Sequence, residues 1–173
     1  MKKIIAFSGS NSKTSINQQL IEAIASSNEQ METLNLRDYE APLYGIDIEE
    51  EIGIPETMTL LKQKIKDADG ILVSCPEHNG SMPAVLKNTI DWLSRIEPKV
   101  FEDKPTVFLS TSPGPRGGVS ALEHLVAVMP YRGANIVGSL SIGSFQDHYA
   151  NGVLSEEVTS KLNPIIEDLK NSM

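Results

Sequence analysis

Short runs of mostly apolar residues recur along the chain and restrict its fold more than any other feature. Three of them are residues 3–7 (KIIAF), 71–75 (ILVSC) and Pro105–Thr111 (PTVFLST). Runs without polar alternation are typical of strands that are buried on both faces, as in parallel sheets. Because parallel strands need a crossover connection, usually a helix, these runs predict a sheet with helices packed on its faces.

Amphipathic stretches separate the runs and give the expected order of elements. Apolar spacing predicts helices over residues 16–25, 55–68, 83–93, 122–129 and 156–170, and further strands over 31–36 and 135–142. Residues 37–55 and 145–154 are expected to be loops. Five strands alternating with five helices predict a three-layer, doubly wound α/β fold. With right-handed crossovers, the expected strand order is 2-1-3-4-5.

Length and charge narrow the classes of protein. At 173 residues the chain is expected to form one domain with a substantial core. A net charge of −8 argues against nucleic acid or an anionic membrane as the main partner. The chain has one cysteine, and we find neither a signal peptide nor a run of some 18 apolar residues. A cytoplasmic protein is therefore expected.

The loop at residues 8–17 (SGSNSKTSIN) joins the first strand to the first helix. A helix N-terminus carries unpaired N–H groups and the positive end of the helix dipole, so with added hydroxyl groups it favours an anion. The loop lacks the glycine spacing of triphosphate and dinucleotide loops. A small monophosphate therefore fits it better, and the alternative is a polar turn in which Ser15 only caps the helix.

Two more loops, residues 76–82 and 112–118, are expected at the same edge of the sheet, because parallel strands end there together. The loop at residues 76–82 begins with Pro76 and is followed by Pro83, so it should be stiff. Its backbone can approach a ligand closely at Gly80. The donors and acceptors on the edge of a planar heterocycle could form hydrogen bonds with these backbone groups and with Asn79. The alternative is a plain turn with His78 on the surface.

Other chemistry has less support. Glu77 and His78 are adjacent, but no nucleophile accompanies them, and no serine lies in a Gly-x-Ser-x-Gly sequence, so a hydrolase is poorly supported. His124 and His148 lack metal-ligand spacing. Cys75 is interpreted as a packing residue, and so is Trp92, in the core or at a subunit interface.

With these residues in view, the chain resembles the NADPH-dependent FMN reductase family of the flavodoxin-like fold, which includes quinone, azo-dye and chromate reductases. Three motifs carry the resemblance in the right order. They are Gly9-Ser10 with Ser15 and Asn17; Pro76-Glu77-His78-Asn79-Gly80-Ser81-Met82-Pro83 running into Leu86-Lys87-Asn88-Thr89-Ile90-Asp91-Trp92-Leu93; and Ser112-Pro113-Gly114 with Gly117-Gly118.

The resemblance implies an FMN site built from the three loops. The phosphate would be held by the first loop, one ring edge would lie along residues 76–80, and the third loop would flank the other side. The implied contacts are Gly9, Ser10, Ser12, Lys13, Ser15, Ile16, Asn17, Pro76, Glu77, His78, Asn79, Gly80, Ser112, Pro113, Gly114 and Gly117.

The family's chemistry implies hydride transfer from NADPH or NADH to FMN and then to a quinone or similar small acceptor, in ping-pong fashion. No protein acid or base is expected in the first half-reaction, and a homodimer or homotetramer is implied. The sequence leaves two alternative functions open. One is a flavodoxin-like electron carrier that does not oxidise nicotinamide itself, and the other is a module that binds another phosphorylated metabolite.

Two residues depart from the family pattern. Ser12 stands where the family usually has arginine, which removes a bidentate phosphate contact that Lys13 can replace only as a point charge. We expect the loss to weaken FMN binding by ~1–2 kcal/mol. His78 stands where the family usually has tyrosine. A titratable ring there would change stacking, substrate preference or pH dependence.

Overall fold

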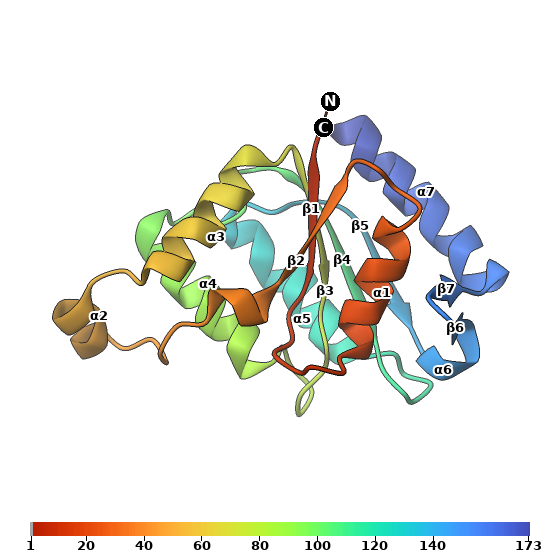
Figure 1. Ribbon diagram of the computed structural model, residues 1–173, viewed down its shortest axis with the longest axis horizontal. Coiled ribbons are helices and arrows are strands. Elements are labelled where there is room, and N and C mark those ends of the chain that lie inside the picture. Colours follow the sequence, from red (N-terminus) through yellow and green to blue (C-terminus); the bar gives the residue numbers. More distant parts are fainter. Residues whose placement is uncertain (1) are drawn as a thin grey trace.

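The computed structural model describes residues 2–173 and contains a five-stranded parallel sheet (Figure 1). The strand order is β2-β1-β3-β4-β5, which confirms the predicted order. The strands are β1 (Ile4–Ser8), β2 (Met31–Asn35), β3 (Gly70–Ser74), β4 (Pro105–Thr111) and β5 (Asn135–Ile142). In-register pairing places Ser8 beside Ser74 at the carboxyl ends of the neighbouring strands β1 and β3.

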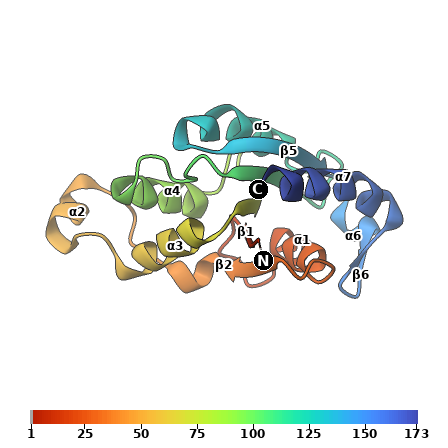
Figure 2. The ribbon, with the colours of Figure 1, turned by 90° about the horizontal axis from the view of Figure 1, so that it is seen from above.

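Helices cover both faces of this sheet (Figures 1 and 2). They are α1 (Ile16–Ala25), α2 (Ile46–Ile52), α3 (Glu56–Asp67), α4 (Ala84–Ile96), α5 (Val119–Val128), α6 (Phe145–His148) and α7 (Glu156–Ser172). Short 3-10 helices follow β2 and α5, at Leu36–Tyr39 and Met129–Arg132. A small antiparallel hairpin, β6 (Tyr149–Ala150) and β7 (Val153–Leu154), precedes α7.

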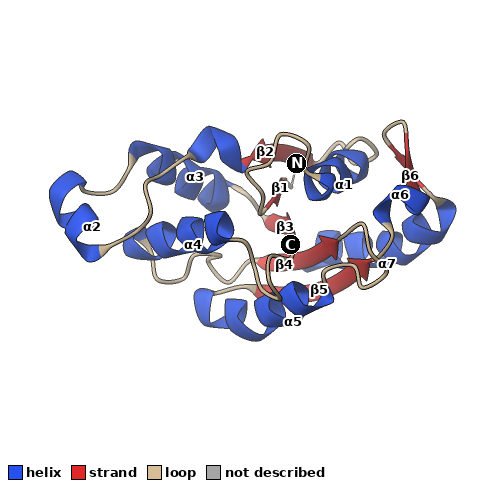
Figure 3. Ribbon diagram, turned by 90° about the horizontal axis from the view of Figure 1, so that it is seen from below, coloured by secondary structure: helices blue, strands red, loops and turns tan. Residues whose placement is uncertain are grey.

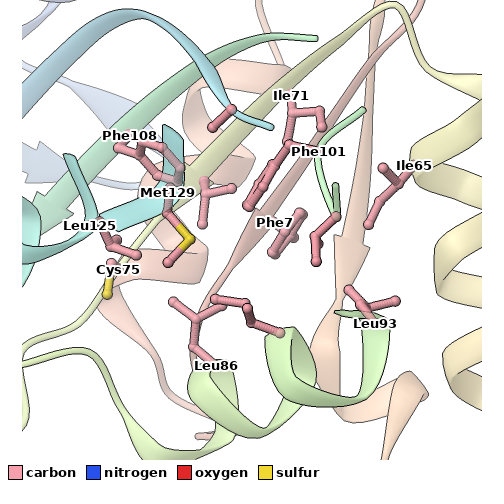
Figure 4. Packing of buried hydrophobic residues seen from close by; sticks show 14 of the residues in the cluster. Phe7, Ile65, Ile71, Cys75, Leu86, Leu93, Phe101, Phe108, Leu125 and Met129 are labelled. Carbon is pink, nitrogen blue, oxygen red and sulfur yellow. The ribbon is translucent and has the colours of Figure 1, made fainter. Parts of the chain in front are cut away.

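The core is divided by the sheet into two apolar clusters. One lies between the sheet and α3, α4 and α5, and Figure 4 shows part of it, with Phe7, Phe108 and Leu86 among the side chains. The other lies between the sheet and α1 and α7. Along β1 the side chains alternate between the two, because successive residues of a strand point to opposite faces. This arrangement accounts for the unbroken apolar runs in the sequence.

The two regions expected to be loops contain short elements instead. Residues 37–55 include most of the first 3-10 helix and all of α2, and residues 145–154 include α6 and the β6–β7 hairpin. The pattern of α2 gave no helix signal because none of its residues is buried, and Ile46 and Ile52 are 56% and 53% exposed. One turn, as in α6, is too short for a periodic pattern.

The segment that carries α2 projects from the molecule as an arm of residues 40–55, seen at the left of Figure 1. Its base is attached to α4. The indole Nε1 of the fully buried Trp92 donates to the Pro42 carbonyl at 2.7 Å, and the Tyr44 N–H donates to Asn88 Oδ1 at 2.7 Å. Trp92 therefore is a core residue that fixes the start of the arm.

Candidate functional site

The loops that follow β1, β3 and β4 meet at the carboxyl edge of the sheet, at the bottom of Figure 1 and facing the viewer in Figure 3. They surround a cleft of about 260 Å³. Its walls come from all three loops: Ser10, Thr14, Ser15, Ile16, Asn17, Pro76, Glu77, His78, Thr111, Ser112 and Pro113. The convergence predicted from the sequence is therefore present in the structure.

The first loop is shaped by its own hydroxyl groups. Ser10 Oγ accepts a hydrogen bond from the Ser12 N–H at 3.1 Å, and Ser12 Oγ accepts one from the Thr14 N–H at 3.3 Å. Ser15 is the N-cap of α1, and its Oγ accepts from the Gln18 N–H at 3.2 Å. The serines thus turn the chain tightly into the helix.

This turn leaves donors free at the start of α1. The backbone N–H groups of Ile16 and Asn17, the first two residues of the helix, make no hydrogen bond to residues 2–173. No acidic side chain lies in the first turn of α1. Unpaired N–H groups and the positive helix end, beside the Ser10 and Thr14 hydroxyls, therefore suit an anion that enters the cleft.

The side chain of Asn17 serves the framework of the site. The residue is 2% exposed, and its Nδ2 donates to the Thr111 carbonyl at 3.0 Å, while Oδ1 accepts from the Thr111 N–H at 3.2 Å and from Ser74 Oγ at 2.7 Å. One amide therefore joins the start of α1 to the carboxyl ends of β3 and β4. The predicted Asn17 contact with a phosphate stays a prediction, and the free backbone N–H is the group suited to it.

The second loop contains a tight two-residue hairpin. The His78 N–H donates to the Ser81 carbonyl at 2.9 Å, and the Ser81 N–H donates back at 3.1 Å. Asn79 and Gly80 both have positive φ, 53° and 78°, as a type I′ turn requires. Both are exposed, and open space surrounds the position where a Gly80 Cβ would lie. Glycine is therefore needed here for its backbone angle.

Glu77 and His78 point to different surroundings. Glu77 Oε2 accepts hydrogen bonds from the N–H groups of Ser120 and Ala121, at 3.0 and 3.2 Å, at the start of α5. His78 is exposed at the rim of the cleft. The pair is therefore not arranged as a joint acid and base.

The third loop is held by the residues that follow β5. The Ser144 N–H donates to the Gly114 carbonyl at 2.9 Å, and the Phe145 N–H donates to the Ser112 carbonyl at 3.1 Å. A Cβ on Gly117, where φ is +64°, would lie 2.3 Å from Ser141 Oγ. Gly117 therefore permits the loop to pack on β5, and its backbone lies on that side of the loop.

Cys75 is a buried packing residue, as predicted. Its side chain lies in the cluster under α4 and α5 (Figure 4), and it is fully buried. Burial raises the pKa of its thiol to about 12, and the nearby Glu77 carboxylate adds to the rise. The thiol is therefore protonated at neutral pH and unsuited to nucleophilic chemistry.

Nine of the sixteen predicted contact residues line the cleft: Ser10, Ser15, Ile16, Asn17, Pro76, Glu77, His78, Ser112 and Pro113. The other seven lie outside its walls: Gly9, Ser12, Lys13, Asn79, Gly80, Gly114 and Gly117. Gly9 packs on α4, where an added Cβ would lie 2.7 Å from Leu86 Cδ2. Ser12 and Lys13 are exposed on the outer part of the first loop.

Sequence reasoning missed two residues that line the cleft, Thr14 and Thr111. Thr14 directly precedes the N-cap of α1, a position that the capping pattern could have indicated. Thr111 is the last residue of β4, and its side-chain hydroxyl donates to the Ile142 carbonyl at 2.7 Å. Thr111 lies next to the cleft because β4 ends there, and no sequence motif marks this residue.

Comparisons with known proteins point to one protein family. The model of the family "NADPH-dependent FMN reductase" matches residues 2–147. The NADPH:quinone oxidoreductase of Arabidopsis thaliana is 34% identical over 168 residues, covering 92% of this chain and 85% of that protein. The quinone reductase of Escherichia coli K12 is 32% identical over 126 residues, covering 73% of this chain but only 63% of that protein. The match thus spans less than two thirds of the bacterial relative.

A solved structure extends the likeness to the whole fold. The structure of FerB, a flavoenzyme NAD(P)H:(acceptor) oxidoreductase from Paracoccus denitrificans, superposes with a TM-score of 0.81 at 26% identity. The superposition covers 99% of each chain. The overall fold is therefore shared over nearly the whole of this chain.

Replacement of Asn17 by alanine tests its role in the framework. The variant leaves the Ser74 hydroxyl and both backbone groups of Thr111 without their partner, so we expect the free energy of unfolding to fall by about 3 kcal/mol. Chemical denaturation measures this change. The control is Asn11→Ala in the same loop, where the side chain is exposed. Equal unfolding midpoints for the two variants would contradict the assigned role.

Proposed function

Because the chain belongs to the NADPH-dependent FMN reductase family, we propose that it binds FMN in this cleft. We further propose that it passes a hydride from NADPH or NADH, through FMN, to a quinone or a similar small acceptor. The observation that carries the proposal is the group of free donors at the start of α1, within a cleft whose other walls are stiff loops.

The residues present fit the two ends of FMN. The N–H groups of Ile16 and Asn17 and the hydroxyls of Ser10 and Thr14 would hold the phosphate, and no acidic side chain lies in the first turn of α1 to repel it. Pro76 and His78 on one side and Ser112 and Pro113 on the other would border the ring. Because Ser12 and Lys13 are exposed and lie outside the walls, they would act on the phosphate only at longer range.

The protein's part in the reaction is to bind and orient. FMN, when bound, supplies the hydride chemistry. The hairpin at residues 78–81 and the third loop, each fixed by backbone hydrogen bonds, would restrict the ring to one plane. Cys75 is buried and protonated and Glu77 is bonded to α5, so neither is positioned to move a proton at the ring. The proposed first half-reaction needs no such group.

The names of relatives suggest the acceptor. The proteins from Escherichia coli and Arabidopsis are both named for quinone reduction, and a 40% identical relative from Burkholderia is named 2-hydroxy-1,4-benzoquinone reductase. We therefore propose a benzoquinone-type acceptor for this chain. It would reach the exposed side of the ring, past His78 at the rim of the cleft.

Anaerobic titration tests the proposal. The FMN-loaded protein should lose its visible flavin absorption when NADPH or NADH is added, and a benzoquinone should restore it. A failure to bind FMN at tens of micromolar ligand would contradict the proposal and favour a module for another phosphorylated metabolite. Bleaching that requires a separate reductase would instead identify a flavodoxin-like electron carrier.

We also propose that the chain forms a single-domain homodimer or homotetramer in the cytoplasm and acts without nucleic acid. In support, the arm leaves Leu43, Ile46 and Ile52 largely exposed, and such apolar surface is typical of contact regions. Within residues 2–173, no helix is both long and apolar enough to span a bilayer. Cell fractionation tests the location.

Light scattering coupled to size-exclusion chromatography tests the assembly. We expect a dimer or tetramer mass for the parent protein and a shift toward monomer for Leu43→Ser/Ile46→Ser, because these residues leave apolar surface exposed on the arm. Thr59→Ser, at an exposed position of α3, is the control. A monomer mass for the parent protein would refute the proposed assembly.

A further inference from the structure

Helix α5 cannot cap its own N-terminus. At α1 and α7 the caps are Ser15 and Ser155, whose hydroxyls accept from the third residue of each helix. The corresponding residue of α5 is Gly118, which has no side chain and adopts φ +76°. The unpaired N–H groups of a helix start require an acceptor. In α5 that acceptor comes from a different part of the chain.

The acceptor is the carboxylate of Glu77, 43 residues earlier, in the loop after β3. Its Oε2 accepts from the second and third residues of α5, Ser120 and Ala121. Gly118 suits this position because of its backbone angle, φ +76°, which side chains rarely adopt. A Cβ there would lie at ordinary contact distance, 3.5 Å, from Glu77 Cβ and closer, 3.3 Å, to Ser110 Cβ.

A second contact joins the same loop to the same helix. On the far side of the Asn79–Gly80 turn, Ser81 Oγ lies 2.9 Å from His124 Nδ1, on the next turn of α5. The second loop is therefore attached to α5 on both sides of the Asn79–Gly80 turn. Movement of the hairpin would need both contacts to break, so α5 fixes the position of this wall of the cleft.

We infer that Glu77 is a positioning residue with a second effect: its negative charge lowers the reduction potential of the FMN bound in this cleft. The inference rests on the proposed function. Glu77 would hold the second loop against α5, and its charge would act on the bound FMN. Glu77 touches the cleft wall while its carboxylate is bonded to α5.

The sign follows from charge. Two-electron reduction makes bound FMN more electron-rich and more negative, so a nearby carboxylate disfavours the reduced form relative to the oxidised form. The positive end of α5 and the guanidinium of Arg116, which donates to Ser120 Oγ at 2.8 Å, offset part of that charge. Removal of the carboxylate leaves this positive potential uncompensated beside the ring. The potential should therefore rise.

Three variants separate the charge from the contact. Glu77→Gln removes the charge and keeps an acceptor for the α5 N–H groups, and Glu77→Ala removes both. Glu123→Gln removes an equal charge from an exposed position of the same helix. Spectroelectrochemistry of the FMN-loaded proteins gives the potential, and hydrogen exchange of the Ser120 and Ala121 amides in the proteins without FMN gives the state of the cap.

In Glu77→Gln we expect the affinity ratio of reduced to oxidised FMN to rise about tenfold, which is a positive shift of about 30 mV for two electrons. Glu77→Ala should also exchange the two amides at least tenfold faster, and Glu123→Gln should match the parent protein in both measurements. An unchanged potential in Glu77→Gln, or unchanged exchange in Glu77→Ala, would overturn the inference. Failure of the parent protein to bind FMN would contradict the proposed function, and the exchange measurement would still judge the contact.

Discussion

The buried amide of Asn17 is the interaction on which the geometry of the cleft depends. It bonds to Ser74 at the end of β3 and to both backbone groups of Thr111 at the end of β4, while its own backbone lies in the first turn of α1. In a parallel sheet, hydrogen bonds between neighbouring strands fix the backbone positions only as far as the last paired residues. Beyond that point, this side chain ties the start of α1 to the ends of β3 and β4, while Ser144 and Phe145 hold the third loop from its other side.

Side chains and backbone groups have different functions in these loops. The polar side chains of the loops mostly bond within the protein: Ser15 caps α1, Glu77 caps α5, and Ser10 and Ser12 fold the first turn. The groups left for a ligand are largely backbone N–H groups and the hydroxyls at the cleft wall. Such a site has its donors fixed before the ligand arrives, which lowers the entropy that binding must overcome.

The sequence predicted the sheet because burial on both faces requires unbroken apolar runs, as in Ile71 to Val73. It predicted the three loops because parallel strands end at one edge. It failed at α2, where no residue is buried, and at the roles of single polar side chains. The partners of Asn17 lie 57 and 94 residues away and those of Glu77 lie 43 and 44 residues away, and no local pattern encodes such contacts.

The central claim is that the start of α1 holds the phosphate of FMN, and a comparison of FMN with riboflavin tests it most directly. Riboflavin carries the same ring without the phosphate. If the Ile16 and Asn17 N–H groups bind the phosphate, calorimetric titration should show FMN binding at least a hundredfold more tightly, and the amide resonances of these two residues should shift only with FMN. Equal affinities for the two ligands, or shifts confined to other loops, would contradict the account.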